Sequence, residues 1–194
     1  MTCTLILGGA RSGKSVYAER HAHASGKEVV YIATAQAGDG DGDEDGVDEM
    51  RARIAHHRTR RPAHWRTVEE GLGLAAVLER ECASGRVLLV DCLTLWLSNL
   101  MLDGPAPPTD TGRFEPPPRF DAERAAFLDL LARGLPGELL LVSNEVGMGI
   151  VPMGALARRF ADEAGRLNQA VAARAERVVL VAAGLPLMLK GEPC

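Results

Sequence analysis

The sequence predicts an α/β fold in which a mostly parallel sheet carries helices on both faces. Short continuous apolar runs alternate along the chain with longer segments of helical pattern. This alternation is typical of parallel sheets whose two faces are both buried. The chain has 194 residues, of which 46% are hydrophobic, and this is enough for one sizeable core. We therefore expect residues 1–194 to form a single domain.

The expected strands are the five apolar runs at residues 4–7, 28–33, 87–90, 139–142 and 178–182. Helices are expected to lie between them, and the clearest helical patterns cover residues 16–22, 122–133 and 156–174. Right-handed crossovers would bring the carboxyl ends of parallel strands to one edge of the sheet. Binding sites in such sheets lie at that edge.

Two segments are expected to be flexible loops. Residues 37–46 contain too much glycine and aspartate to bury apolar surface, and residues 103–119 contain six prolines. The first segment begins like a calcium-binding EF-hand loop at Asp41, Asp43 and Asp45. However, Ala52 stands where that motif needs a bidentate glutamate, so a flexible insertion is the favoured interpretation.

A phosphate-binding loop follows the first predicted strand and precedes a predicted helix. The motif G-x-x-x-x-G-K-[ST] is matched by Gly8, Gly9, Ala10, Arg11, Ser12, Gly13, Lys14 and Ser15. Its glycines let successive backbone N–H groups point at an anion, and the helix N-terminus adds a partial positive charge. The motif in this context predicts a nucleoside triphosphate site and a P-loop NTPase of the RecA-like class.

Charge and composition argue against several other classes. The formal net charge of −4 disfavours a general binder of nucleic acid or anionic membranes. The sequence contains no long uncharged apolar run, so we expect neither a membrane span nor a signal peptide. The four cysteines are scattered and form no C-x-x-C pair, which favours reduced thiols in a cytoplasmic protein and makes a zinc site improbable.

A second cluster of reactive side chains lies in residues 48–61, which read as a helix that begins acidic and ends basic. Five arginines surround His56 and His57 there, and Arg53 and Arg60 share a helical face with His56. Nearby cations keep an imidazole neutral, and a neutral imidazole is a competent nucleophile. The alternative interpretation is a solvated basic helix face with no chemical role.

Several motifs together resemble a known family, the bifunctional adenosylcobinamide kinase / adenosylcobinamide-phosphate guanylyltransferases of cobalamin biosynthesis. The matching segments cover nearly the whole chain: GGARSGKS at 8–15, YIATAQ at 31–36, RIAHH at 53–57, RPAHWRTVE at 61–69, VDCLTLWLSNL at 90–100, VSNEVGMGIVP at 142–152 and LARRFADEAGRLNQ at 156–169. The glycine loop alone would be generic, whereas the ordered series is specific. The two predicted loops are departures that leave these motifs intact.

The resemblance implies two reactions at one site. The aminopropanol hydroxyl of adenosylcobinamide takes the γ-phosphoryl group of ATP or GTP, and the resulting phosphate then receives GMP from GTP. In this family the second transfer resembles a ping-pong reaction through a guanylylated histidine, which by motif match is His56. The resemblance also implies Mg²⁺, adenosylcobinamide and its phosphate as partners, and a homo-oligomer that by the same resemblance is a homotrimer.

The resemblance assigns roles to individual residues. Lys14 is expected to stabilise the transferred phosphoryl group, and Ser15 and Asp91 to hold Mg²⁺. The expected nucleotide contacts outside the glycine loop are Ile32, Ala33, Thr34, His57, Arg58, Thr59, Arg60, Glu69 and Asp91. For Asn144 and Glu145 a structural turn and a catalytic role remain equally open, and His64 and Trp65 are expected to pack.

Two rival functions remain. One is a P-loop small-molecule kinase in which the histidine pair is only a solvated face. The other is a P-loop ATPase that drives assembly or regulation without a covalent histidine. The ordered motif series favours the bifunctional transferase over both.

Overall fold

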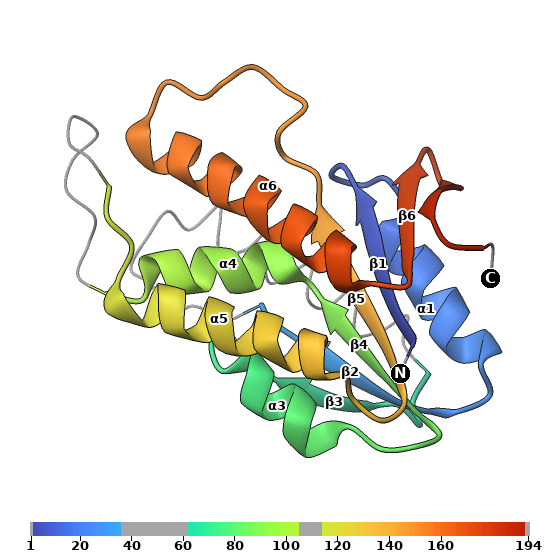
Figure 1. Cartoon of the computed structure of the whole chain (residues 1–194). Helices are drawn as coiled ribbons and strands as arrows, with labels where there is room; N and C mark the ends of the chain where they lie inside the picture. Colours follow the sequence, from blue (N-terminus) through green and yellow to red (C-terminus); the bar gives the residue numbers. More distant parts are fainter. Residues whose placement is uncertain (1, 36–61, 105–113, 193–194) are drawn as a thin grey trace.

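The computed structural model describes residues 2–35, 62–104 and 114–192, and in these residues the chain forms one seven-stranded sheet (Figure 1). The strand order is β3-β2-β4-β5-β1-β6-β7. All neighbouring strands run parallel except β7, which pairs antiparallel with β6. The strands are β1 Thr2–Gly8, β2 Glu28–Ala33, β3 Arg66–Glu69, β4 Arg86–Asp91, β5 Glu138–Asn144, β6 Arg177–Ala182 and β7 Leu185–Lys190.

Helices cover both faces of this sheet, but unequally. The described helices are α1 Lys14–Ala24, α3 Leu74–Glu81, α4 Leu93–Leu102, α5 Pro118–Arg133 and α6 Ala155–Arg174. Helices α3 to α6 lie together on one face, while α1 packs on the other (Figure 1). Of the helices in the described ranges, none combines the length and apolarity needed to cross a membrane.

Two hydrophobic cores follow from the alternation of side chains along the strands. In β1, Leu5 and Leu7 point to the core shared with α3 to α6, and Ile6 points to the core shared with α1. The larger core is centred on fully buried aromatic residues, with Trp96 of α4 packed edge-on against Phe127 of α5 at a centroid distance of 5.1 Å. The sheet is thus held rigidly from both sides.

The predicted fold class is confirmed, and each of the five predicted strands and the three clearest helices lies within an observed element. Strands β3 and β7 were not predicted because both are edge strands. Three of the four side chains of β3 are exposed, and β7 is mostly exposed and contains Pro186. Helix α4 is apolar around most of its circumference, so its sequence shows no helical period.

One predicted boundary is wrong. The loop expected at 103–119 ends earlier, because Pro118 and Arg119 form the first turn of α5. Proline is well tolerated there, since the first helical residues have no intrahelical partner for their N–H groups. Residues 105–113 of that predicted loop, the whole loop predicted at 37–46 and the helix predicted at 48–61 lie outside the described residues.

Candidate functional site: the carboxyl edge of the sheet

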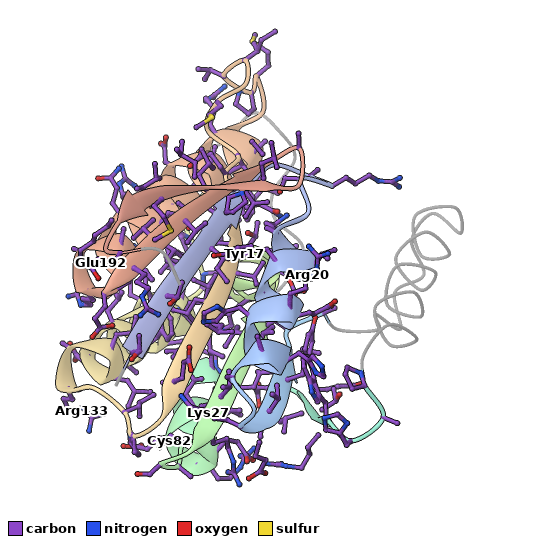
Figure 2. All side chains as sticks on the ribbon, turned by 90° about the vertical axis from the view of Figure 1, so that its right-hand side faces the viewer. Tyr17, Arg20, Lys27, Cys82, Arg133 and Glu192 are labelled. Atoms are coloured by element: carbon purple, nitrogen blue, oxygen red, sulfur yellow. The ribbon has the colours of Figure 1, made fainter. Side chains whose placement is uncertain are left out.

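The carboxyl ends of the parallel strands bring several predicted site residues to one edge. Gly8 at the end of β1 is paired in register with Asn144 of β5. Ala33 at the end of β2 is paired with Glu69 of β3 on one side and with Asp91 of β4 on the other. In Figure 2, Tyr17 in the early part of α1 lies towards this edge, and Lys27, just past the helix, lies towards the opposite one. The edge was predicted from strand direction alone.

The backbone of the glycine loop requires glycine at two positions. A Cβ at Gly8 would lie 2.4 Å from Ser12 Oγ and 2.5 Å from the carbonyl oxygen of Val181. Gly13 has a φ of 96°, in the left-handed region that favours glycine, and its Cβ would meet the Gly184 Cα at 3.1 Å. The N–H of Gly184 donates to the carbonyl of Ser12 at 2.8 Å, so the β6–β7 turn supports the loop from outside.

Lys14 is the buried cation of this edge. Only 9% of the residue is exposed, and its Nζ donates to the carbonyl oxygen of Gly9 at 3.1 Å. Burial lowers the pKa of Lys14 from its ordinary value, whereas the negative charge of Asp91 acts in the opposite direction. Burial and the neighbouring Asp91 raise the pKa of the Cys92 thiol to about 11, so the thiol is neutral at pH 7. The ammonium group is therefore a dehydrated cation at the anion-binding loop.

Asp91 ends the apolar strand β4, and its negative charge favours the charged form of Lys14. The Tyr31 hydroxyl donates a 2.8 Å hydrogen bond to Asp91 Oδ2 and so orients the carboxylate. Tyr31 itself is fully buried in the core shared with α1. Sequence reasoning missed Tyr31, although a tyrosine in an otherwise aliphatic buried strand is a signal that its hydroxyl has a buried partner.

The predicted nucleotide contacts Ile32, Ala33 and Thr34 lie at the carboxyl end of β2 and directly after it. Ile32 is completely buried in the larger core, and Ala33 is partly buried in the smaller one. The buried Thr34 hydroxyl donates to the Cys92 carbonyl at 2.7 Å and accepts from the Cys92 N–H at 2.8 Å. This pair of bonds fixes the turn that follows Asp91. Glu69 is exposed at the end of β3.

A buried polar network beside the glycine loop was also missed from the sequence. The Ser143 hydroxyl donates to Asn168 Oδ1 at 2.7 Å, and Asn168 Nδ2 donates to the Asn144 carbonyl at 3.2 Å. The Asn144 N–H donates to Thr94 Oγ1 at 2.6 Å, and the Glu145 N–H donates to the Gly8 carbonyl at 3.1 Å. The sequence signal for this network was the presence of polar residues, such as Thr94 and Ser143, inside otherwise apolar segments. The network fixes the end of β5 against β1, α4 and α6.

His56, His57, Arg58, Thr59 and Arg60 all lie outside the described residues. Of the two residues expected to pack, Trp65 is buried in the core shared with α1. The expectation for His64 is wrong, because its side chain is exposed in the turn before β3.

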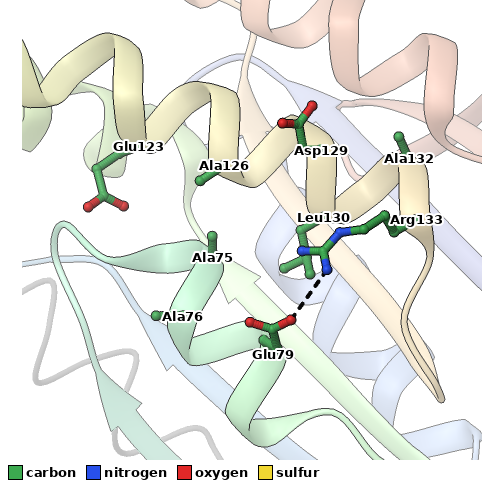
Figure 3. A pocket seen from close by; sticks show the side chains of 9 residues that line it. All are labelled: Ala75, Ala76, Glu79, Glu123, Ala126, Asp129, Leu130, Ala132 and Arg133. Carbon is green, nitrogen blue, oxygen red and sulfur yellow. Dashed lines mark ion pairs between the residues drawn. The ribbon is translucent and has the colours of Figure 1, made fainter.

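A hollow between α3 and α5, of about 800 Å³, lies away from this edge (Figure 3). Its charged lining consists of three carboxylates, from Glu79, Glu123 and Asp129, and one guanidinium, from Arg133. Arg133 already pairs with Glu79 at 3.6 Å. Since the acidic lining repels phosphate, this hollow is a poor candidate for a nucleotide site.

Comparison with known proteins identifies a family that matches nearly the whole chain. The profile of the family described as "Cobinamide kinase / cobinamide phosphate guanyltransferase" matches residues 4–189. The "Bifunctional adenosylcobalamin biosynthesis protein CobP" of Pseudomonas aeruginosa is 59% identical over 189 residues, which are 97% of this chain and 98% of that protein. The protein CobU of Escherichia coli, described in the same words, is 42% identical over 191 residues, which are 96% and 98% of the two chains.

A solved structure supports the fold alone. A protein of Pyrococcus horikoshii OT3 matches with a TM-score of 0.52 at 6% sequence identity, over 99% of this chain and 87% of that one. At this identity the likeness says nothing of substrates.

Proposed function

Since this chain belongs to the cobinamide kinase / cobinamide phosphate guanyltransferase family, we propose that it carries out both reactions on adenosylcobinamide and its phosphate. The first reaction phosphorylates the aminopropanol hydroxyl with ATP or GTP. The second transfers GMP from GTP through a guanylyl-histidine at His56, and it yields adenosylcobinamide-GDP and pyrophosphate.

The observation that carries the proposal is the geometry of the glycine loop and Lys14. The Lys14 ammonium is buried against this loop, where it donates a hydrogen bond to the Gly9 carbonyl, and the close approaches at Gly8 and Gly13 show how tightly the loop backbone is packed. A triphosphate oxygen is a stronger partner for this ammonium than a neutral carbonyl. In the first reaction the acceptor hydroxyl oxygen bonds to the γ-phosphorus as the bridging P–O bond to the leaving nucleoside diphosphate breaks, and the hydroxyl proton passes to solvent. Lys14 then neutralises charge that grows on the transferred group and the leaving diphosphate.

The second reaction needs a nucleophile that the glycine loop lacks. A neutral imidazole nitrogen of His56 attacks the α-phosphorus of GTP, and pyrophosphate leaves. An oxygen of adenosylcobinamide phosphate then attacks the same phosphorus, and the N–P bond to His56 breaks. Dividing one transfer into two is ordinary covalent catalysis. The arginine-rich sequence around His56 supports this role, because guanidinium groups hold phosphates and keep the imidazole neutral.

The donor set at the edge fits Mg²⁺. Ser15 supplies a hydroxyl oxygen and Asp91 a carboxylate oxygen, and Mg²⁺ prefers such oxygen ligands together with waters and substrate phosphates. The hydrogen bond from Tyr31 keeps the Asp91 carboxylate in one orientation. A Mg²⁺ held by Ser15 and Asp91 would offset the negative charge of the substrate phosphates. We assign the metal to Ser15 and Asp91.

The remaining nucleotide contacts are proposed from the family resemblance. They are Ile32, Ala33, Thr34, His57, Arg58, Thr59, Arg60 and Glu69, together with the glycine loop and Asp91. On the same basis we propose a cytoplasmic homotrimer. The mass of the purified protein in solution, measured by light scattering, tests the trimer directly.

The two reactions are tested by labelling. Purified protein with Mg²⁺ is incubated with GTP labelled on the α-phosphate and, separately, on the γ-phosphate, and is then denatured. We expect protein-bound label from the α-position only, removed by acid and stable to alkali. In parallel, transfer of γ-label to adenosylcobinamide measures the kinase.

His56→Ala and His57→Ala are matched variants for this test. We expect His56→Ala to lose the bound label and guanylyl transfer while it keeps the kinase, and His57→Ala to keep the bound label. If the wild type shows kinase activity but no bound label, the protein is a small-molecule kinase without the covalent histidine step. If the wild type hydrolyses nucleotide but forms no cobinamide product, the protein is a P-loop ATPase.

A further inference from the structure

The loop between β5 and α6 exposes a cluster of large apolar side chains, which we call the apolar rim: Val146, Met148, Ile150, Val151 and Met153. Ile150 is 98% exposed, Met153 91% and Met148 80%. Single exposed apolar residues are common on proteins, whereas several on one short loop indicate a binding surface. The loop forms the arch between β5 and α6 in Figure 1.

The apolar rim is attached directly to the phosphate-binding edge. Its first residue follows Glu145, whose N–H donates to the Gly8 carbonyl at the start of the glycine loop. Glu145 Oε1 accepts from the Gly147 N–H at 2.8 Å, which shapes the first turn of the loop. At the far end, Arg158 of α6 donates to the carbonyls of Pro152 and Met153. Both ends of the rim are therefore held to the framework of the site.

We propose, resting on the proposed function, that the apolar rim binds the corrin macrocycle of cobinamide. Phosphoryl transfer brings the acceptor oxygen to about 3–3.5 Å from the phosphorus, so the body of the acceptor covers the surface next to the glycine loop. The macrocycle is broad and carries methyl groups around its perimeter. Buried apolar area stabilises such a complex, and flexible methionine side chains adapt to an irregular apolar outline.

A second set of exposed apolar side chains lies on β7, and comparing it with the apolar rim shows which surface suits the macrocycle and which suits another protein chain. Leu187 and Leu189 lie along the edge strand β7, whose regular backbone suits pairing with another protein chain. The apolar rim is instead an irregular loop without a strand edge, and it starts one residue from a backbone bond to the glycine loop. Its position suits the acceptor of the transferred phosphate rather than a second copy of the chain.

The test uses the double variant Met148→Ser/Ile150→Ser in the full chain. Both side chains are exposed, so the substitutions remove no core packing. We expect the KM for cobinamide to rise roughly 10- to 100-fold, as the loss of one to two buried apolar side chains implies, with the KM for ATP and kcat at saturation unchanged. Binding of cobinamide without nucleotide, measured by equilibrium dialysis and visible absorbance, should weaken by the same factor. The matched control Leu187→Ser/Leu189→Ser should change neither value.

Each other outcome has a definite meaning. If the wild type phosphorylates cobinamide and the double variant keeps its KM, the rim does not bind the macrocycle, and the proposed function stands. If the higher KM appears only where light scattering shows that an oligomer has dissociated, the rim is an interface between copies and this inference is overturned. If the wild type neither binds nor phosphorylates cobinamide, the proposed function is overturned and the inference with it.

Discussion

Both edges of the sheet bury charged side chains, but among the residues that the structure describes those at the amino edge are ion-paired and the one at the carboxyl edge is not. At the amino edge, Glu138 at the start of β5 is paired with His21 Nε2 at 3.0 Å and with Lys27 Nζ at 2.9 Å. Glu81 nearby is paired with Arg66 and with Arg80. At the carboxyl edge, Lys14 is buried and forms no ion pair with any residue in the described ranges.

This difference separates charges that hold the fold from charges that are kept for a ligand. A buried charge that already has its partners is stable but chemically occupied. A buried cation with only a carbonyl partner lowers stability, and this cost is recovered when an anion binds. The contrast therefore predicts which lysine and which carboxylate matter for catalysis and which matter for stability.

Lys14→Ala gives the largest expected effect. Both reactions should fall at least about 10³-fold, because Lys14 neutralises charge on the transferred phosphates. Thermal unfolding should show an unchanged or slightly higher Tm, since the variant removes a buried cation without an ion-pair partner. Rates of each reaction and calorimetry of the free protein check both expectations.

The matched variant at the opposite edge is Lys27→Ala. It should leave kcat unchanged and lower the Tm, because it removes one partner of Glu138. A loss of Tm in Lys14→Ala as large as that in Lys27→Ala would contradict the division between the two edges.

Glu138→Gln should destabilise the protein at neutral pH by about 1–3 kcal/mol, the range for hydrogen bonds to charged groups, without changing the catalytic rates. Burial alone would raise the pKa of Glu138, but hydrogen bonds from Lys27 and His21 outweigh it and lower the pKa below the ordinary value of 4.5. The carboxylate therefore contributes stability above the unfolded-state pKa, and this contribution is lost as the pH falls through the lower folded-state pKa.

Urea unfolding at a series of pH values measures this contribution. The difference in unfolding free energy between wild type and Glu138→Gln should be largest near neutrality and should shrink as the pH falls below 4.5. A difference that stays constant down to the acid end would show that packing, not charge, stabilises this edge.

Tyr31→Phe should have a smaller effect, confined to the carboxyl edge. Without the hydroxyl, the Asp91 carboxylate loses its 2.8 Å hydrogen bond and its fixed orientation. Residues that orient a metal ligand typically change metal affinity or activity by about 10- to 100-fold, and we expect the lower end here. Titration of kinase activity with Mg²⁺ should show a higher half-saturating concentration. An unchanged Mg²⁺ titration together with a lower kcat would remove Asp91 from the metal site.

Sequence reasoning found the parts of the fold that repeat a strong local pattern. The five inner strands have continuous apolar sequences with clear ends, and the glycine loop matches a fixed motif. Strand direction alone predicted that Gly8 and Asp91 meet at one edge. The edge strands β3 and β7 have exposed side chains that resemble a loop pattern, so local sequence could not distinguish them.

The missed site residues depend on contacts between distant parts of the chain. Tyr31 acts on Asp91 across sixty positions, and Ser143 is bonded to Asn168 of another element. A polar residue in an apolar run signals that a buried partner exists, but it does not say which residue that partner is. His56 remains a prediction from the sequence, since it lies outside the described residues.

The smallest expected effect concerns the hollow between α3 and α5, which belongs to neither edge. The pair between Arg133 Nη1 and Glu79 Oε1 spans 3.6 Å, and about two thirds of each side chain is exposed (65% and 62%). Water screens such a pair, and ordering two long side chains offsets much of the attraction. Glu79→Gln should therefore change the free energy of unfolding by less than about 0.5 kcal/mol and leave the KM for ATP unchanged. Removal of a negative charge would instead improve nucleotide binding if the phosphates lay in this hollow, because the acidic lining repels them. A KM for ATP that falls several-fold in Glu79→Gln, with Lys14→Ala still active, would move the nucleotide site from the carboxyl edge to this hollow.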